Sequence, residues 1–555
     1  MRAVCIHGHF YQPPRENPWI GVVGRQRSAR PFHDWNERIT AECYAPNAEA
    51  RVLDAAGSRR VSNYRQLSFD IGPTLHEWLA VYAPEVDRAI VEAGRRRGAL
   101  AQAYNHAILP LADELTKELQ VRWGIRDFEH RFGRAAEGLW LPETAVDTPT
   151  LEVLARHGIR FAIVAPHQIA RVKAPGDERW TATSETLDTR RPYVAHTAAG
   201  DVTLFAYDGA LARAVAFEGA LHDGRAFGER LADAVLAAEE PSLVHLATDG
   251  ESYGHHHAHG EMALAAVWVE LERRGVPTTT YGEYLAIHPA TWECEIAERT
   301  SWSCAHGVER WRAACGCALQ PGTSQSWRAP LRAAADHLWT ALRGAFPPEL
   351  EPVLLDWIDV HLGREPAPAL FARHGVEETP RTRLAIETAW LAQRAFTSCG
   401  WFFDDLGGLE ALQIIRYLAR GAELLERWSP RPEALQLRTI LADAKADDGT
   451  SGAAIFDRVV ARDRATPLDL AALWARHAVA ARDEGPPSTA SLERLALETI
   501  DASHHGEVAI RMRDSGEEFT HGVVVGRNGD AWAGPADTAP GSPGWRRAHS
   551  SQDDG

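Results

Sequence analysis

The sequence predicts an α/β region built on parallel strands, followed by an α-helical region. Between residues 1 and 290, short apolar runs alternate with helical periodicity at roughly 30 to 40 residues per unit, as in a parallel barrel or a doubly wound sheet. From about residue 328 the strand signals vanish, and Ala, Leu, Arg and Glu, which are good helix formers, dominate. At 555 residues the chain is too long for one ordinary core, so two or more domains are expected.

Seven short apolar runs are the predicted strands, and polar residues follow most of them. The runs cover residues 2–7, 65–69, 98–104, 137–141, 160–165, 202–205 and 243–248, and residues 278–280 are an eighth strand or a degenerate ending. In a barrel the carboxyl ends of the strands converge on one face, so the polar residues after them are candidates for one pocket. These residues are His7, Asp70, His106, Glu143, His167 and Asp249. Because no G-x-G-x-x-G sequence follows the first strand, a nucleotide site is disfavoured.

The stretch LVHLATDGESYGHHH, residues 243–257, carries the densest group of reactive side chains. It begins as a buried strand, continues with Asp249 and Glu251, and ends in the three consecutive histidines His255–His257. A strand, a polar burst and then a helix are the sequence form of a βα unit with its reactive loop at the carboxyl end of the strand.

Composition restricts the class of protein and its partners. The net charge of −17 argues against nucleic acid or an anionic membrane as the main partner. Nineteen Trp outnumber sixteen Phe and eleven Tyr, which favours carbohydrate stacking or plain core packing. No signal peptide and no apolar run long enough to span a membrane are recognised, and seven Cys suggest a reducing environment, so a cytoplasmic protein is expected.

The second half of the chain is predicted to be helical. The expected helices cover residues 330–343, 350–362, 381–396, 409–428, 432–444 and 453–460. After about residue 512 the chain is rich in Gly, Asp, Pro and Ser, which predicts a low-complexity, disordered tail. The expected domains are therefore a barrel over residues 1–290, a helical domain over 291–512 and the tail over 513–555.

Two carboxylates at strand ends are the groups that cleavage of a glycosidic bond requires. One attacks or stabilises the anomeric carbon, and the other protonates the leaving oxygen. Glu143 follows Trp140 at the end of the fourth strand, and a buried strand there would desolvate it, as a carboxylate with a tuned pKa requires. Asp249 follows an apolar strand in the same way. A separation of about 5 to 5.5 Å would predict retention of configuration, and a wider one inversion.

Histidines are the second notable group, in an HxH sequence at residues 7–9 and an HHHxH sequence at residues 255–259. Imidazole with carboxylate is a ligand set for Zn²⁺ or another transition metal. The spacing matches no metal template, so hydrogen bonds from neutral imidazole to sugar hydroxyls are expected, with no metal and no cofactor.

Two further clusters lie after the barrel. Cys304, His306, Cys315 and Cys317 resemble a zinc site in number, but CxH and CxC are not the spacings of a zinc knuckle or finger, so buried thiols in a pocket wall are favoured. Residues 401–405, WFFDD, interrupt the helical region and are either a helix junction or a loop that lines a sugar site.

Eight stretches of the sequence resemble glycoside hydrolase family 57, and within it the group with a C-terminal domain of unknown function, DUF3536. They are HGHFYQPPRENPW (7–19), ECYAPN (42–47), SFDIGPTLHEWL (68–79), QAYNHAILPLA (102–112), GLWLPETAVD (138–147), TDGESYGHHH (248–257), SWSCAHGVERW (301–311) and GWFFDDLGGLE (400–410). They occur in family order over most of residues 1–420.

The resemblance implies an incomplete (β/α)7 TIM-like barrel followed by an α-helical domain that helps to line the active site. It also implies a retaining mechanism on α-glucans, with no metal. By the matching motifs, the nucleophile is Glu143 and the acid/base is Asp249. Asp70 stands where related sequences have Asn, and the added charge would raise the pKa of Glu143.

The family motifs and the clusters above together give a set of expected sugar contacts. They are His7, His9, His106, Trp140, His255, Trp302, His306, Trp401 and Asp404, with the choice between His7 and His9 open; Glu251 and the other histidines of residues 255–257 are expected to support the site or to contact sugar.

The predicted function is that of a retaining glycoside hydrolase or glucanotransferase whose partner is an α-glucan or oligosaccharide, and not nucleic acid or a membrane. Two alternatives are a metal-dependent polysaccharide deacetylase on a related barrel and a non-catalytic glucan-binding protein. Linkage, chain length, oligomeric state and the balance between hydrolysis and transfer are left open.

Overall fold

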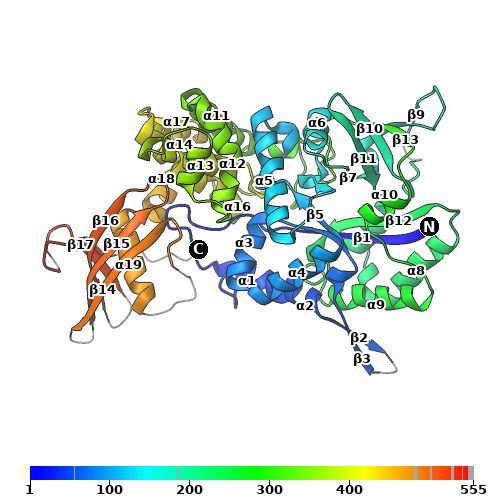
Figure 1. The fold of residues 1–555 in the computed structure, drawn as a ribbon, viewed down its shortest axis with the longest axis horizontal. Helices are drawn as coiled ribbons and strands as arrows, with labels where there is room; N and C mark the ends of the chain where they lie inside the picture. Colours follow the sequence, from blue (N-terminus) through cyan, green and yellow to red (C-terminus); the bar gives the residue numbers. More distant parts are fainter. Residues whose placement is uncertain are drawn as a thin grey trace. The chain divides into compact units, whose positions relative to one another are not determined.

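The computed structural model describes residues 1–54, 57–183, 187–479, 486–500, 503–526, 530–540 and 542–547 (Figure 1). The chain forms two compact units. The barrel unit comprises Met1–Pro13 and Asn36–Arg310, and the C-terminal unit comprises Pro14–Trp35 and Trp311–Gly555.

Parallel strands form the curled sheet of the barrel unit. Their order is β12 (Ser242–Asp249), β1 (Arg2–Phe10), β4 (Ser68–Ile71), β5 (Ala99–Gln102), β6 (Leu139–Trp140), β7 (Phe161–Val164) and β11 (Gly200–Ala206), with β6 and β7 joined through a bridge from Gly138 to Phe161. These are the seven predicted strands, so the incomplete (β/α)7 barrel is confirmed. The eighth candidate contributes only an isolated bridge from Thr278 to Val4 in this part of the structure.

Helices connect these strands in the alternation that the sequence predicts (Figure 1). They are α1 (Trp35–Ile39), α2 (Ala45–Ala48), α3 (Pro73–Tyr82), α4 (Pro84–Arg96), α5 (Glu114–Phe132), α6 (Thr148–Arg156), α7 (Gly209–Phe217), α8 (Gly224–Leu236), α9 (Gly260–Arg273) and α10 (Tyr281–Ile287). Aspartates begin four of them: the side chains of Asp113, Asp147, Asp208 and Asp223 accept backbone N–H groups of the first turns of α5, α6, α7 and α8. Such N-caps fix where each helix starts after its strand.

Four short strands extend the edge of the barrel at β11, all in antiparallel pairs except β10 with β13. They are β10 (Tyr193–Thr197), β13 (Trp292–Ile296), β8 (Ile169–Lys173) and β9 (Thr181–Ala182). A separate hairpin joins β2 (Ala50–Asp54) and β3 (Gly57–Val61).

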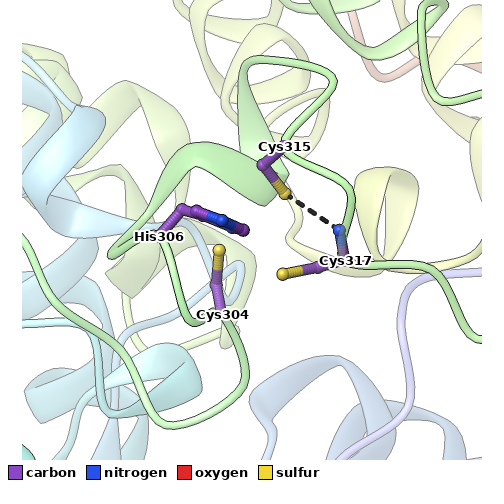
Figure 2. A group of neighbouring side chains, drawn as sticks. All are labelled: Cys304, His306, Cys315 and Cys317. Atoms are coloured by element: carbon purple, nitrogen blue, oxygen red, sulfur yellow. Dashed lines mark hydrogen bonds between the residues drawn. The ribbon is translucent and has the colours of Figure 1, made fainter.

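The chain between residues 297 and 327 has little regular structure, apart from the 3₁₀ turn η9 (Glu309–Trp311). Within this one stretch, the side chains of Cys304, His306, Cys315 and Cys317 point toward one another (Figure 2).

The C-terminal unit is helical over residues 328–479, as the sequence predicts. Its helices are α11 (Arg328–Ala345), α12 (Glu351–His361), α13 (Ala367–Arg373), α14 (Pro380–Arg394), α15 (Cys399–Phe402), α16 (Leu409–Trp428), α17 (Glu433–Leu441), α18 (Gly452–Asp463) and α19 (Pro467–Val479). The long helix α16 packs against α11, α14, α15, α17 and α18 and forms the centre of this core. Among the described helices of the chain, none combines the length and the hydrophobicity that crossing a bilayer requires.

An antiparallel sheet follows the helices, where the sequence predicts helix up to residue 512 and then a disordered tail. Its strands are β14 (Ala490–Ile500), β15 (Ser503–Met512), β16 (Glu518–Val525), β17 (Ala531–Pro535) and β18 (Arg546–Arg547), in sequential order, and α19 packs on it. The prediction of disorder is therefore wrong for the strands after residue 513, whereas residues 548–555 lie outside the described residues. The Gly and Asp residues that suggested disorder form tight turns, such as the one after β15 where Gly516 has φ +72°.

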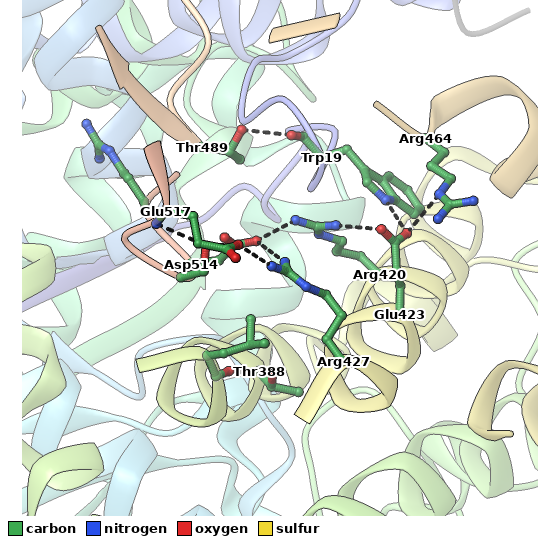
Figure 3. Close-up of polar contacts among 12 residues, drawn as sticks. Trp19, Thr388, Arg420, Glu423, Arg427, Arg464, Thr489, Asp514 and Glu517 are labelled. Carbon is green, nitrogen blue, oxygen red and sulfur yellow. Dashed lines mark hydrogen bonds and ion pairs between the residues drawn. The ribbon is translucent and has the colours of Figure 1, made fainter. Parts of the chain in front are cut away.

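Buried charges join this sheet to the helical core of the same unit (Figure 3). Asp514, in the turn after β15, accepts hydrogen bonds from Arg420 (2.8 Å) and Arg427 (3.4 Å) of α16. Arg420 also donates to Glu423 (2.9 Å), which in turn accepts the indole N–H of Trp19 (2.9 Å). The network thus ties α16 to both the sheet and the segment 14–35.

We expect Asp514→Ala to lower the free energy of unfolding by about 3 kcal/mol, because two arginines lose a buried partner while Arg420 keeps Glu423. Asp457→Ala is the matched control, since Asp457 and Arg438 are about half exposed (51% and 49%) and water screens such a pair, so its loss should cost much less stability. Urea unfolding followed by circular dichroism measures both. Equal losses in the two variants would contradict the role given to Asp514.

Candidate active site

A row of three charged or ionisable side chains crosses β12, β1 and β4, the three strands at one end of the barrel sheet. The register of β12, β1 and β4 sets Asp249 beside His9, and His9 beside Asp70. Because alternate residues of a strand point to the same face, His7 lies on the same side of β1 as His9. The Asp70 carboxylate binds both imidazoles, with Oδ1 3.0 Å from Nε2 of His7 and Oδ2 2.8 Å from Nδ1 of His9.

Aromatic rings pack against these histidines. Trp140 of β6 stacks on His7 and His9, with ring centroids 4.9 and 4.8 Å apart. His106 lies next to His9, with their Nε2 atoms 3.1 Å apart, and Tyr11 stacks on His106 at 3.9 Å. Trp140 is fully buried, so it supports the histidines from within the barrel.

Glu143 follows β6 and is buried with its carboxylate held from one side. Oε2 accepts hydrogen bonds from the indole N–H of Trp302 (2.9 Å) and the hydroxyl of Ser303 (2.6 Å). The backbone N–H of Trp302 also donates to the Glu143 carbonyl (3.0 Å). Two side-chain contacts and one backbone contact therefore fix Glu143 through one short segment that comes much later in the chain.

The backbone at Glu143 is strained. Glu143 (φ 57°) and Thr144 (φ 50°) both lie in the left-handed region, which costs about 1–3 kcal/mol for each residue that is not glycine. Gln168 compensates, because its amide accepts the Thr144 hydroxyl (2.8 Å) and donates to the Thr144 carbonyl (2.8 Å). His106 has a left-handed backbone as well (φ 55°). Such strain is concentrated at functional sites.

The two candidate carboxylates influence each other. Burial raises the pKa of Glu143; the hydrogen bonds from Ser303 and Trp302 oppose this, and the charge of Asp249 adds to it. The side chain of Asp249 reaches solvent at the end of β12. The surrounding protein nevertheless removes water from this carboxylate and so raises the pKa of Asp249. The charge of His9 lowers this pKa, and the charge of Asp70 raises it further.

Asp70 therefore raises the pKa of Asp249, while the upward shift of Glu143 comes from burial and Asp249. The sequence predicts that the charge of Asp70 raises the pKa of Glu143, whereas in the structure it raises the pKa of Asp249. The reason is that β1 places Asp70 and Asp249 on either side of His9.

His9 is the cation of the site. Burial opposes its protonation, but the charge and hydrogen bond of Asp70, together with Asp249 and Glu251, outweigh burial and raise its pKa to about 9. Burial lowers the pKa of His7 and, more strongly, that of His106. The protonated imidazole of His9 therefore lies among four carboxylates. Of the two histidines of β1, His9 is the one that lowers the pKa values of Glu143 and Asp249.

Glu251, the next carboxylate along the chain after Asp249, supports the site from the turn that follows β12. It accepts the backbone N–H of Tyr11 (3.1 Å) and the hydroxyl of Tyr44 (2.6 Å). Burial and the nearby Asp249 charge raise its pKa to about 7. It is therefore a buried group that fixes the start of the loop after β1.

Four of the predicted sugar contacts have other partners in the structure. His255 is bonded to Glu42 through its Nδ1 (2.5 Å), and His306 lies with Cys304, Cys315 and Cys317. Within the C-terminal unit, Trp401 is buried and donates its indole N–H to the Arg328 carbonyl (3.1 Å). Asp404 accepts the backbone N–H groups of Leu319 (3.0 Å) and Gln320 (2.6 Å). These contacts stabilise the local structure around each of the four residues. That any of the four contacts sugar stays a prediction.

Ser303 and Tyr44 are among the residues of the cluster that were not assigned a role from the sequence. Ser303 lies beside Trp302 in the motif SWSCAHG, and Tyr44 lies in the motif ECYAPN. Their membership of long motifs was the only signal for them, because neither follows a strand of the barrel.

Comparison with known families gives two matches. Residues 36–296 match glycosyl hydrolase family 57, and residues 324–512 match DUF3536, a domain of unknown function. The chain carries a glycosyl hydrolase family 57 domain. The predicted family and the predicted enzyme class, glycoside hydrolase, are thereby confirmed. A comparison with curated protein sequences finds no significant match.

Three solved enzyme structures share the fold, and two of them are described as family 57 branching enzymes. An exo-type maltose-forming amylase from Pyrococcus sp. ST04 is 14% identical, with a TM-score of 0.59 over 82% of this chain and 88% of its own. Branching enzymes from Pyrococcus horikoshii (17% identical, 83% and 95% covered) and Thermococcus kodakaraensis (15%, 84% and 95%) each have a TM-score of 0.51. The last was crystallised with glucose. At these identities the likeness establishes the fold alone.

We expect Asp70→Asn to lower the pKa of His9 from about 9 toward its ordinary value, because Asp70 is the strongest group that favours the charged imidazole. The pKa of His9 is raised on folding. The stability that its protonation contributes is therefore complete below about pH 6.5 and lost as the pH rises to about 9. Asp70→Asn should remove this alkaline loss of stability.

Nuclear magnetic resonance of histidine-labelled protein measures the His9 titration, with the signal assigned by its absence in His9→Gln. Urea unfolding across the same pH range gives the stability. An unchanged His9 pKa in the Asp70→Asn variant would contradict the proposed electrostatics.

Proposed function

We propose that this family 57 chain is a retaining enzyme of α-glucans, with Glu143 as nucleophile and Asp249 as acid/base. The observation that carries the proposal is the pair of carboxylates at the carboxyl ends of β6 and β12, near enough that the charge of Asp249 raises the pKa of Glu143. The α-glucan substrate class is supported by the names of the relatives above, which are an amylase and two branching enzymes.

The first step forms a glycosyl-enzyme. A Glu143 carboxylate oxygen attacks the anomeric carbon, the bond from that carbon to the leaving oxygen breaks, and Asp249 gives its proton to that oxygen. The raised pKa of Asp249 suits it to hold this proton. In the second step the Asp249 carboxylate takes a proton from the acceptor hydroxyl, whose oxygen attacks the anomeric carbon and releases Glu143.

The surroundings of Glu143 favour the ionised form that attack requires. The Trp302 indole, the Ser303 hydroxyl and protonated His9 all oppose its raised pKa. These hydrogen bonds offset part of the effect of burial, which still leaves the pKa of Glu143 raised. The same groups would also stabilise Glu143 when it leaves in the second step.

Hydrolysis and chain transfer share the first step and differ in whether water or a sugar hydroxyl is the acceptor. We propose an α-1,4-linked chain as donor, in line with the relatives' names. Incubation with maltooligosaccharides and with glycogen, followed by measurement of new reducing ends and of transferred chains, tests both. New reducing ends alone would indicate hydrolysis, and transferred chains would indicate a transferase. The absence of both products would contradict the proposal.

Glu143→Gly should lose turnover of a maltooligosyl fluoride by several orders of magnitude and recover it in the presence of azide. Azide replaces the missing nucleophile by direct displacement, so the product is a β-glycosyl azide. Analysis of the product by nuclear magnetic resonance gives its configuration.

Asp249→Gly is the matched variant for that experiment. It retains the nucleophile, and azide attacks the glycosyl-enzyme, so its azide product has the α configuration. Glu295→Gly, which changes an exposed side chain on β13, should behave like wild type. Unimpaired activity of Glu143→Gly, or the α product from it, would refute the assigned roles.

Ser303→Ala should lower kcat/KM by roughly 10- to 150-fold, which corresponds to ~1.5–3 kcal/mol for a hydrogen bond to a charged group. Loss of the hydroxyl raises the pKa of Glu143, and Glu143 acts as the anion. The acidic limb of the kcat/KM profile should therefore move to higher pH. Ser303→Thr keeps the hydroxyl and should restore the position of the limb. A limb that stays in place in Ser303→Ala would mean that it does not report Glu143.

A further inference from the structure

Four metal-ligating side chains gather in the stretch that follows the barrel. The sulfur atoms of Cys304, Cys315 and Cys317 and a ring nitrogen of His306 all lie within 4.8 Å of one another. Figure 2 shows the four side chains pointing toward a common centre. All four belong to residues 304–317, so the local path of one stretch of chain brings them together.

Two tight turns create this convergence. The backbone N–H of Gly307 donates to the Cys304 carbonyl (3.1 Å), which closes a turn that carries Cys304 and His306. Gly316, with φ +86°, reverses the chain between Cys315 and Cys317. The backbone N–H of Cys317 donates to Sγ of Cys315 at 3.5 Å. Hydrogen bonds to a thiolate are among the outer contacts that fix metal ligands.

The donor set indicates which ion would bind. Three thiolates and one imidazole form a complete tetrahedral set for a structural Zn²⁺ site, which has no open position for water. With Zn–S bonds of about 2.3 Å, tetrahedral ligand atoms lie about 3.8 Å apart, so a contraction of about 1 Å would close the present arrangement around an ion. Cys315 and Cys317 are half-buried and His306 is exposed, which differs from the buried thiols that the spacing suggested.

We propose that Cys304, His306, Cys315 and Cys317 bind one structural zinc ion. Binding deprotonates the thiols and releases their protons to solvent. A disulfide within this group would use two of the three sulfurs and leave the remaining thiol and the imidazole without a role, whereas one zinc ion uses all four groups.

The site adjoins the residues that hold Glu143. Trp302 and Ser303, which donate to the Glu143 carboxylate, directly precede Cys304. A zinc ion on Cys304 would therefore restrict the segment that positions Glu143. This consequence rests on the proposed function, whereas the zinc site itself does not.

The test is the metal content of the full chain, purified without a histidine tag and measured by mass spectrometry of the elements. We expect about one zinc ion per chain in wild type and a loss of at least tenfold in Cys315→Ser and in Cys317→Ser. Cys399→Ser, which changes another half-buried cysteine, should keep its zinc. His9→Gln should keep its zinc as well, which separates this site from a metal bound at the barrel histidines.

Cobalt substitution gives a second readout that does not depend on the stability of the variants. Wild type reconstituted with Co²⁺ should show the intense visible absorption of a tetrahedral cobalt thiolate, and Cys399→Ser should show it too. Hydrogen exchange of residues 298–317 should be slower with zinc than after removal by a chelator. These readouts need no enzyme activity, so inactivity of the wild type would count against the proposed function alone.

Four results would overturn the zinc site. They are wild type without zinc after purification and after incubation with Zn²⁺, iron in its place, zinc that is lost in His9→Gln but kept in Cys315→Ser, and a disulfide found by mass spectrometry among these cysteines in the reduced protein.

Discussion

The central interaction of the barrel unit is the contact of one buried carboxylate, Asp70, with two histidines of β1. It exists only because β4 and β1 pair in a single register, which sets Asp70 opposite His9. The neighbouring pairing of β12 with β1 then sets Asp249 on the other side of His9. A shift of either strand by one residue would turn these side chains to the opposite face of the sheet. The hydrophobic pattern of the strands therefore controls the electrostatics of the site.

Burial of these charges is costly, and the structure shows how the cost is limited. Protonated His9 lies among Asp70, Asp249 and Glu251, so its positive charge offsets part of their mutual repulsion. The strained backbone of Glu143 and Thr144 is held by the Gln168 amide and by the Trp302 N–H. Such strain persists only where several contacts determine the same conformation, and here they come from two different parts of the chain.

The strands and their terminal carboxylates could be predicted from the sequence because their signals are local. An apolar run followed by Asp249 or Glu143 needs no knowledge of the tertiary structure to be recognised. The C-terminal sheet escaped prediction because β14 carries Glu493, Arg494 and Glu498 in place of an alternating apolar face. Helix formers earlier in the same region then outweighed the weak strand signal.

The roles of Ser303 and Gln168 could not be predicted, because each depends on a distant contact that no periodicity records. Glu143 and Ser303 are brought together by the path of residues 297–303, which crosses the end of β6 outside any strand of the barrel. Backbone bonds from Val146 to Thr300 and from Trp302 to Glu143 fix this crossing at both ends of the strained turn. The orientation of the candidate nucleophile therefore depends as much on this irregular segment as on the barrel. Variation in the segment would alter the ionisation of Glu143 while the strands stayed unchanged, which offers one physical route by which enzymes of one barrel fold can differ in reactivity.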